Sequence, residues 1–231
     1  MSKRNKLQKF AELLTFPNVY ENFNPKAPQL HGVNGVPVDL KGQWCSKHFG
    51  NDNPIVLELA CGRGEYTLDM ARSSPNRNFI GVDVKGARIW KGAGIALEEE
   101  LDNVAFLRTR IEQIGLFFAS EEISEIWITF PDPFLRKSKA NRRLTAPRFL
   151  KDYQKILRQD GLIHLKTDER QLYEYTLEVL ADFPHAKLLY HDDDIYAKAL
   201  PMPELEIKTY YERMHLEKGK TIKYIRFKLE A

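Results

Sequence analysis

One short segment of the chain combines a single carboxylate with a dense group of cations. An apolar run over 126–130 stops at Pro131, and Asp132 follows between two prolines. The cations come directly after it: Arg136, Lys137, Lys139, Arg142 and Arg143. Proline on each side restricts the backbone and so directs the Asp132 side chain. An acid in a pocket with cations around it suits a nucleic-acid base that enters a reaction centre while its phosphates are bound at the rim. A salt-bridged surface loop is the alternative.

A second candidate site is the segment ELACGRG, which begins at Glu58. Gly62 and Gly64 let the backbone approach a ligand closely and begin a helix. Asp83 follows at about the separation at which a carboxylate binds ribose hydroxyls. A nicotinamide-binding loop would have a third glycine where Thr67 stands, and Glu58 would repel its pyrophosphate. A cationic ligand with a free amino group fits better, which favours S-adenosylmethionine and a methyltransferase. A packing turn without a ligand is the remaining alternative.

Apolar runs alternate with helical patterns over most of the chain. Strands are expected over 54–60, 78–84, 104–109, 125–130, 162–167, 186–191 and 221–229, and helices over 65–73, 87–101, 111–119, 147–161 and 170–183. Pro147 suits the first turn of its helix, and Gly161 resembles a C-terminal glycine cap. Strands alternating with helices predict a Rossmann-like α/β fold, a mostly parallel seven-stranded sheet with helices on both faces. Ligands bind beyond the carboxyl ends of the central strands of such sheets.

Length and composition indicate one globular α/β domain. The chain has 231 residues, of which 43% are hydrophobic and 29% charged, with a net charge of +3. No apolar run reaches the length of a membrane span, and the start MSKRNKLQKF lacks the apolar core of a signal peptide, so we expect a cytoplasmic protein. Cys45 and Cys61 cannot form a disulfide framework.

Residues 1–50 differ from the rest. Lysines and Arg4 precede a short amphipathic piece, and prolines and glycines then break any long element. We interpret this part as a basic N-terminal arm and extended wrap, and residues 51–231 as a single domain; a loosely held terminus is the alternative. Two further motifs are weak. Residues 218–221 lack the first glycine of a phosphate loop, and the acids of 191–194 fit a solvated loop better than a metal site.

Four blocks of sequence carry a resemblance to a known family. LELACGRGEYT, ITFPDPFLRKSKANRRL, LKTDERQLYEY and TYYER occur in this order within residues 54–216. The combination resembles bacterial tRNA (guanine-N7)-methyltransferases, which implies a class I S-adenosylmethionine-dependent methyltransferase acting on guanine 46 of the tRNA variable loop. The resemblance implies that Glu58 and Asp83, beside the glycines, contact the methyl donor. It also implies that Asp168, Thr209 and Glu212 shape the guanine pocket. Asp132 is expected at the centre of the active site, where it also contacts the methyl donor.

The chain departs from the family pattern at several positions. Ala60 replaces the first glycine of the loop, and Asp83 replaces a frequent Glu. Arg110 stands where the family commonly has an acid near the adenine of the cofactor, so Arg110, Glu112 or a backbone group is the candidate for that contact. Arg136 replaces a common Lys and is expected to bind substrate. Lys137, Lys139, Arg142 and Arg143 are the predicted RNA-binding residues, together with the N-terminal arm.

The chemistry of guanine sets what the site must do. N7 carries a lone pair and no proton, so its methylation needs no obligatory general base, and positioning and exclusion of water should dominate. Asp132 or Asp168 could accept hydrogen bonds from N1–H and the 2-amino group; the sequence does not decide which. The expected partner is tRNA, with no membrane, no required metal, and a monomer or weak homodimer. Rival interpretations are methylation of another RNA or of an exocyclic amine, and a noncatalytic RNA-binding module.

Overall fold

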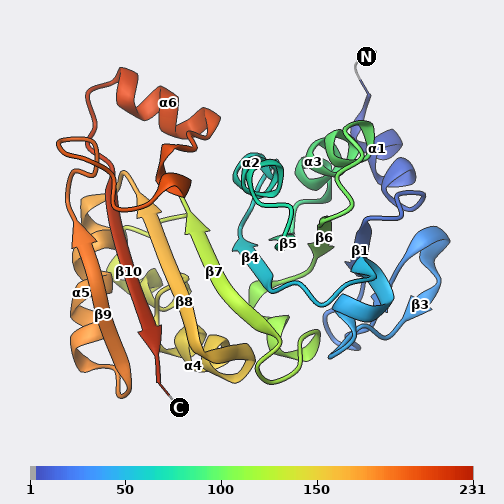
Figure 1. Ribbon diagram of the computed structural model, residues 1–231, viewed down its shortest axis with the longest axis horizontal. Coiled ribbons are helices and arrows are strands. Elements are labelled where there is room, and N and C mark those ends of the chain that lie inside the picture. The colour runs from blue at the N-terminus through green and yellow to red at the C-terminus, as the bar shows by residue number, and fades with distance from the viewer. Residues whose placement is uncertain (1–3, 231) are drawn as a thin grey trace. The chain divides into compact units, whose positions relative to one another are not determined.

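The computed structural model describes residues 4–230 of the chain (Figure 1). These residues form two compact units, which divide between Ala119 and Ser120. Both units are α/β, because each pairs buried strands with amphipathic helices.

The first unit contains a sheet with the strand order β3-β2-β1-β6-β5-β4. Its strands are β1 (Val19–Asn22), β2 (Leu30–His31), β3 (Pro37–Val38), β4 (Ile55–Leu59), β5 (Asn78–Asp83) and β6 (Val104–Arg108). From β1 to β4 across this order the neighbours are parallel, whereas β2 and β3 are antiparallel additions. Every residue of β4 and β5 is buried, as expected of strands covered on both faces. The carboxyl ends of β4, β5 and β6 therefore lie at the same edge of the sheet.

Helices cover this sheet and extend its edge. Helix α2 (Glu65–Ser73) follows β4, and α3 (Gly86–Glu98) follows β5; both pack on the central strands. Helix α1 (Lys6–Leu13) lies beside α3 (Figure 1). It begins with a capping box, in which Asn5 and Gln8 each accept a hydrogen bond from the other's backbone N–H at 2.9 Å. Short helical turns complete the unit: η1 (Val33–Gly35), η2 (Cys45–Phe49) and η3 (Ile111–Leu116).

The second unit contains a sheet with the order β7-β8-β10-β9. Its strands are β7 (Ile123–Thr129), β8 (Leu157–Thr167), β9 (Ala186–Asp192) and β10 (Lys223–Leu229). β7 and β8 are parallel, and β10 is antiparallel to both β8 and β9. The helical elements are η4 (Lys137–Arg142), α4 (Pro147–Ile156), α5 (Arg170–Asp182), η5 (Pro203–Glu206) and α6 (Tyr210–Glu217). Figure 1 shows α6 beyond the carboxyl ends of β7 and β8.

Aromatic side chains from β7, β8 and β10 pack against one another in the core of the second unit. The rings of Trp127 and His164 stack with centroids 4.1 Å apart, and the Tyr224 hydroxyl lies 2.6 Å from Nδ1 of His164. Trp127 Nε1 donates to Glu125 at 2.5 Å. Burial lowers the pKa of His164, against the opposing effect of the Glu125 carboxylate. Nε2 of His164 faces Glu125 Oε1 at 3.2 Å, so both ring nitrogens of this buried histidine have polar neighbours within the second unit.

The α/β class and the mostly parallel central strands are confirmed, and the strand count is corrected. The described residues contain ten strands rather than seven, because β1, β2 and β3 form within the segment interpreted as an extended wrap. The expected helix over 111–119 is the 3-10 turn η3.

The prediction of a helix from Pro147 to Gly161 is wrong at its end. Helix α4 stops at Ile156, and β8 begins at Leu157, which pairs with Ile123. The register then shifts before Glu125 pairs with Leu162. Gly161 is needed in this irregular stretch because a Cβ there would lie 2.8 Å from Leu157 Cδ2 and 2.9 Å from the carbonyl oxygen of Arg158. Close backbone approach, not helix capping, explains this glycine.

Candidate functional site

The glycine loop, residues 60–64, connects β4 to α2 through a series of left-handed residues. The φ angles are 60° at Ala60, 58° at Gly62 and 69° at Gly64. Glycine adopts this region without penalty, whereas an L-residue with a Cβ is strained there. The loop is tied to the next strand, since the Cys61 N–H donates to the carbonyl of Val82 at 3.1 Å.

The two glycines of this loop meet different surroundings. A Cβ built on Gly64 would lie 2.6 Å from the Phe106 ring, so this glycine lets α2 begin close against β6. A Cβ built on Gly62 has nothing within 4 Å among the described atoms. Gly64 therefore serves packing, and the backbone at Gly62 is open to a ligand.

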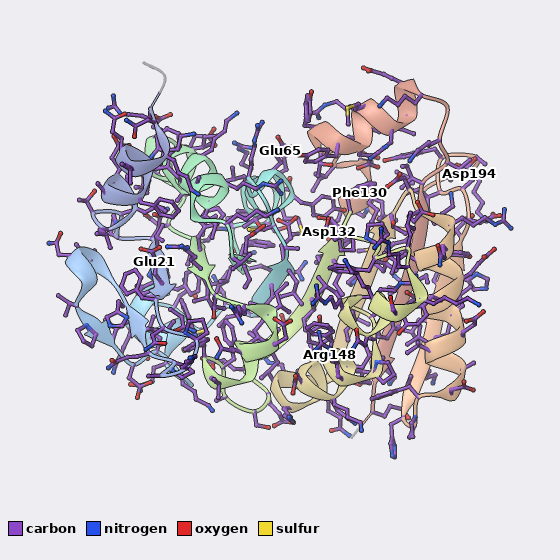
Figure 2. The ribbon with its side chains drawn as sticks, turned by 180° about the vertical axis from the view of Figure 1, so that it is seen from behind. Glu21, Glu65, Phe130, Asp132, Arg148 and Asp194 are labelled. Carbon is purple, nitrogen blue, oxygen red and sulfur yellow. The ribbon has the colours of Figure 1, made fainter. Side chains whose placement is uncertain are left out.

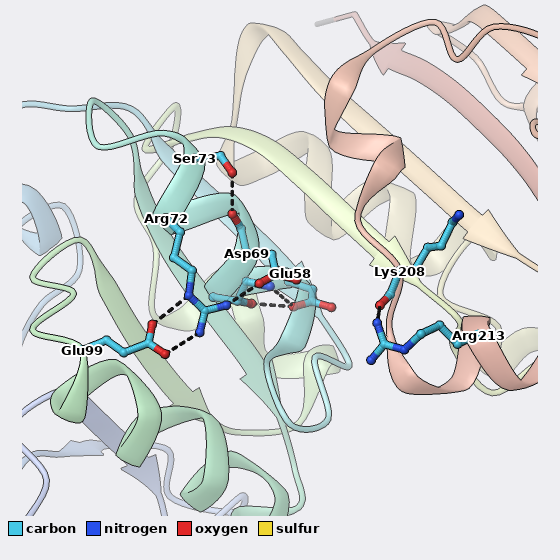
Figure 3. Close-up of polar contacts among 8 residues, drawn as sticks. Glu58, Asp69, Arg72, Ser73, Glu99, Lys208 and Arg213 are labelled. Atoms are coloured by element: carbon cyan, nitrogen blue, oxygen red, sulfur yellow. Dashed lines mark hydrogen bonds and ion pairs between the residues drawn. The ribbon is translucent and has the colours of Figure 1, made fainter.

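Glu58 lies on β4 and is only 2% exposed. Its Oε2 accepts hydrogen bonds from the Thr67 N–H at 2.9 Å and the Thr67 hydroxyl at 2.5 Å (Figure 3). The carboxylate thus caps the first turn of α2, where its charge also complements the helix dipole. Figure 3 also shows Arg72 of α2 between Asp69 and Glu99. Arg72 forms an ion pair with each of these acids on the exposed side of the helix.

Asp83 ends β5 and holds the backbone on both sides of the site. Its Oδ2 accepts from the Gly62 N–H at 2.9 Å, and its Oδ1 accepts from the Lys85 N–H at 2.8 Å. Each oxygen retains a further lone pair for a hydroxyl donor. Burial raises the pKa of the Cys61 thiol, and the charges of Glu58 and Asp83 raise it further, so this thiol stays neutral. The structure thus brings Glu58, Gly62, Gly64 and Asp83 together at one edge of the sheet.

The end of β6 is organised around other residues than Arg110. Arg108 Nη1 pairs with Glu21 of β1 at 2.6 Å, and the Thr109 N–H donates to the Asp83 carbonyl at 3.2 Å. Arg110 is exposed at the start of η3. Arg110 does follow β6, as the prediction of a cofactor contact expected. No described contact links its side chain to the glycine loop.

Asp132 lies in a turn of unusual backbone, the Asp132 turn, residues 130–136. Phe130 and Phe134, on either side of the Pro-Asp-Pro sequence, have φ angles of 47° and 43°. Bulky residues rarely adopt this region, and such strain gathers at functional sites. Asp132 itself is exposed beyond the end of β7 (Figure 2). The prolines were therefore only part of what directs this side chain.

The cations after the turn fall into two groups. Arg136, Lys137, Lys139 and Arg142 are exposed on and beside η4. Arg143 is only 3% exposed. Its Nε donates to the Pro133 carbonyl at 2.9 Å and its Nη2 to the Phe134 carbonyl at 3.1 Å. The prediction that Arg143 binds RNA does not fit this burial, because its guanidinium is engaged inside the protein.

Asp168, at the end of β8, has a cationic neighbour. Lys220 Nζ lies 2.5 Å from its Oδ2, and His215 Nδ1 lies 3.4 Å from the same oxygen. The His215 and Phe130 rings are 20° from parallel with centroids 6.2 Å apart. An acid beside two near-parallel rings could receive a flat base that offers N–H donors.

Thr209 and Glu212 have structural partners. Thr209 is the N-cap of α6 and accepts from the Glu212 N–H at 3.2 Å. Glu212 is fully buried, and its Oε1 accepts from Lys166 Nζ at 2.8 Å and from the Tyr196 hydroxyl at 2.6 Å. Burial lowers the pKa of Lys166 to about 8, with the Glu212 charge opposing that shift. Glu212 Oε2 is buried with no hydrogen-bond partner among the described residues.

The start of α6 is held from the loop before it as well. Arg213 donates from Nη1 to the carbonyl of Lys208 (Figure 3). Lys166 donates to the carbonyls of Leu205 and Ile207 at 3.0 and 2.8 Å. The sequence interpretation did not include Lys166, although a lysine in the apolar strand 162–167 is a signal of a buried pair.

Three further observations concern other kinds of site: a groove, a metal site and a membrane span. A groove of about 650 Å³ lies between α1 and α3, and its lining includes Lys9, Glu12, Phe16 and Trp90 but none of the predicted donor-binding residues. Within residues 4–230, no three or more His, Cys, Asp or Glu side chains are grouped to hold a metal ion. Over the same residues, no helix is long and apolar enough to cross a membrane.

Comparison with known proteins identifies relatives over the whole length. Residues 52–225 match a family model described as "Putative methyltransferase". A tRNA (guanine-N(7)-)-methyltransferase of Christiangramia forsetii is 48% identical over 100% of both chains. One of Porphyromonas gingivalis is 50% identical over 93% of this chain and 86% of its own. The crystal structure of the 16S rRNA methyltransferase KamB has a similar fold, with a TM-score of 0.62 and 13% identity over 84% of this chain and 95% of that one.

Proposed function

Because this chain belongs to the tRNA (guanine-N(7)-)-methyltransferase family, we propose that it methylates N7 of the guanine at position 46 of the tRNA variable loop. The methyl donor in this proposal is S-adenosylmethionine. The single observation that supports it best is the pair of buried acids, Glu58 and Asp83, at the strand ends around the open backbone of Gly62. That arrangement suits a ligand with a cationic amino group and ribose hydroxyls.

The residues of the glycine loop fit this cofactor. Glu58 supplies negative charge for an ammonium group, and Asp83 has lone pairs left for ribose hydroxyls after binding two backbone N–H groups. Gly62 has open space where a side chain would otherwise stand. When bound, S-adenosylmethionine supplies an electrophilic methyl group on a sulfonium. The loop's own task is to hold and orient, since its polar atoms are fixed before any ligand arrives.

Methylation at N7 requires little proton transfer by the protein. The guanine N7 lone pair is already available, so the chain's residues need to orient the base and exclude water rather than remove a proton. Asp132 is our candidate for this task, because it lies on a strained turn that fixes its backbone. Its carboxylate accepts from N–H donors on the base edge and stabilises positive charge that develops on the ring.

Selection of guanine over adenine follows from acceptor groups. Asp168 presents a carboxylate beside the rings of Phe130 and His215. Guanine offers N1–H and 2-amino donors to such an acid, whereas adenine has an unprotonated N1. Adenine N1 is an acceptor and would face the carboxylate oxygens of Asp168 without a proton between them, so the acid discriminates against adenine. Glu212 and Thr209 fix the start of α6, which carries His215.

RNA binding is assigned to the exposed cations. Arg136, Lys137, Lys139 and Arg142 can contact phosphates, and such contacts position the RNA without reading its sequence. Lys6 and Lys9 of α1 extend the basic character to the first unit. Binding should therefore weaken steeply as salt rises.

The test is product analysis with purified protein. Unmodified tRNA should acquire 7-methylguanosine at position 46, identified by mass spectrometry of the digested RNA, and a transcript with adenine there should acquire none. Asp132→Ala should lower turnover by about a hundredfold, on the scale of losing one well-placed group, with a smaller change in donor affinity. Asp132→Asn keeps an acceptor oxygen without charge and so separates positioning from electrostatics. A methyl on an exocyclic amine or in another loop would refute the assignment, and failure to bind S-adenosylhomocysteine would favour a noncatalytic module.

A further inference from the structure

The last cation of the basic segment, Arg143, differs from its neighbours in its burial and in its hydrogen-bond partners. Arg142 is exposed, and Arg143, the next residue, is 3% exposed. Burying a guanidinium costs free energy unless its N–H groups are bound. A phosphate ligand would require this group at the surface, so its burial calls for a different role.

The described partners of the Arg143 guanidinium belong to the Asp132 turn and to α5. The guanidinium donates to two successive carbonyls, those of Pro133 and Phe134, at 2.9 and 3.1 Å. Its carbon Cζ lies 4.4 Å from the ring centroid of Tyr175 on α5, within cation–π range. The planar fork of N–H groups allows both hydrogen bonds while one face rests on the ring.

The two carbonyls stand where the backbone is strained. Phe134 has a φ of 43°, which an aromatic residue adopts only when its surroundings impose it. A second tether follows, since Gln171 Nε2 donates to the Leu135 carbonyl at 3.0 Å. No described side-chain contact holds the Asp132 carboxylate itself, so the backbone of the turn sets its position.

We propose that Arg143 is a positioning residue that fixes the Asp132 turn through the carbonyls of Pro133 and Phe134, and that it does not bind RNA phosphate. The inference rests on the proposed function, in which Asp132 serves the reaction. Arg143 acts on methyl transfer only through that turn. The basic segment therefore has two tasks, with the exposed cations binding RNA and Arg143 ordering the active-site backbone.

The test compares Arg143→Lys with Arg142→Ala. Lysine keeps the charge but cannot donate to both carbonyls in one plane. We expect Arg143→Lys to lower kcat by at least about tenfold, because misplacing a catalytic group slightly has effects of this size or larger. Its KM for tRNA and the salt dependence of tRNA binding should stay near wild type. Arg142→Ala should raise KM for tRNA and reduce the log–log salt slope by about one.

A double-mutant cycle shows whether Arg143 works through Asp132. In an Asp132→Ala background, Arg143→Lys should have little further effect on kcat, because the group that Arg143 positions is absent. Full additivity would overturn the proposal. So would an Arg143→Lys variant with wild-type kcat, or an Arg143→Ala variant with a flattened salt slope.

Controls separate misfolding and a wrong function from a wrong inference. Affinity for S-adenosylhomocysteine should be unchanged in Arg143→Lys, since the glycine loop does not involve this residue. If Arg143→Lys fails to fold, Tyr175→Leu is the second variant, because it removes the ring but keeps both hydrogen bonds. It should lower kcat by a larger factor than it changes KM. An unchanged kcat in that variant would count against the proposal. Product analysis of the wild type tests the function itself, and the salt-slope comparison requires no turnover.

Discussion

Replacing Glu58 with Gln separates two roles that the structure gives to one carboxylate. Oε2 of Glu58 accepts hydrogen bonds from both the backbone N–H and the hydroxyl of Thr67, at 2.9 and 2.5 Å. The same group is our candidate for the cationic end of the methyl donor. Glutamine has nearly the same shape and keeps one acceptor oxygen, so it removes the charge without opening a cavity.

The expected magnitudes follow from the contacts. A hydrogen bond to a charged group contributes about 1.5–3 kcal/mol and a neutral one about 0.5–1.5 kcal/mol. With two bonds weakened, Glu58→Gln should lower the free energy of unfolding by about 2 kcal/mol. The lost charge should also weaken donor binding by about 1.5–3 kcal/mol, which is roughly a ten- to 150-fold rise in Kd. Affinity for tRNA should not change, because Glu58 is 2% exposed.

Titration calorimetry with S-adenosylhomocysteine measures the donor affinity, and denaturant unfolding measures stability. Thr67→Val is the matched control, since it removes the hydroxyl donor but leaves the carboxylate charged. It should cost about 1.5–3 kcal/mol of stability, the range for a hydrogen bond to a charged group, and leave the Kd for S-adenosylhomocysteine nearly unchanged. If Glu58→Gln binds the ligand normally, or if Thr67→Val weakens binding equally, Glu58 is only a cap for α2 and our interpretation of the donor site is wrong.

The remaining predictions concern backbone strain and pH. Ala60 has a φ of 60°, so Ala60→Gly should relieve about 1–2 kcal/mol of strain, less about 0.5–1 for glycine flexibility, and raise stability. Ala87→Gly, in α3, should instead lower stability by about 0.5–1 kcal/mol. If denaturant unfolding shows that both substitutions change the free energy of unfolding in the same direction, the reasoning is wrong. Burial lowers the pKa of His48 from 6.5 to about 4. Because the unfolded state then binds more protons between these values, stability should fall as the pH falls from 6.5 towards 4. The full loss is on the order of 3 kcal/mol, less for a half-buried ring, and a wild-type pH profile in His48→Gln would rule out this histidine as the cause.

Much of the chain's organisation was predictable from local sequence. Continuous apolar runs such as 54–60 predicted strands buried on both faces, and β4 is buried at every position. The glycine positions of 60–64 predicted a tight turn, and the left-handed angles at Gly62 and Gly64 confirm it. Local patterns succeed here because period, glycine and proline act within a few residues.

Long-range pairing was not predictable in the same way. Residues 19–22 read as part of a wrap, yet β1 pairs in parallel with β6, far along the chain. The end of α4 depended on whether Leu157 could pair with Ile123, and no local signal states that. A short strand or a helix end is decided by its partner, because neither is stable alone.

By itself, the sequence determined which chemical groups this protein has: acids after strands, an open glycine loop, and cations after Asp132. Only the tertiary structure decided what each charge does. Arg142 and Arg143 are identical in type and adjacent, yet one is exposed and the other binds two backbone carbonyls. Glu212 was a predicted pocket residue, and Lys166 is what its charge meets in the core. The physical reason is desolvation. An exposed charge can bind ligands from solution, whereas a buried charge interacts with the protein groups next to it. Burial is a property of the fold.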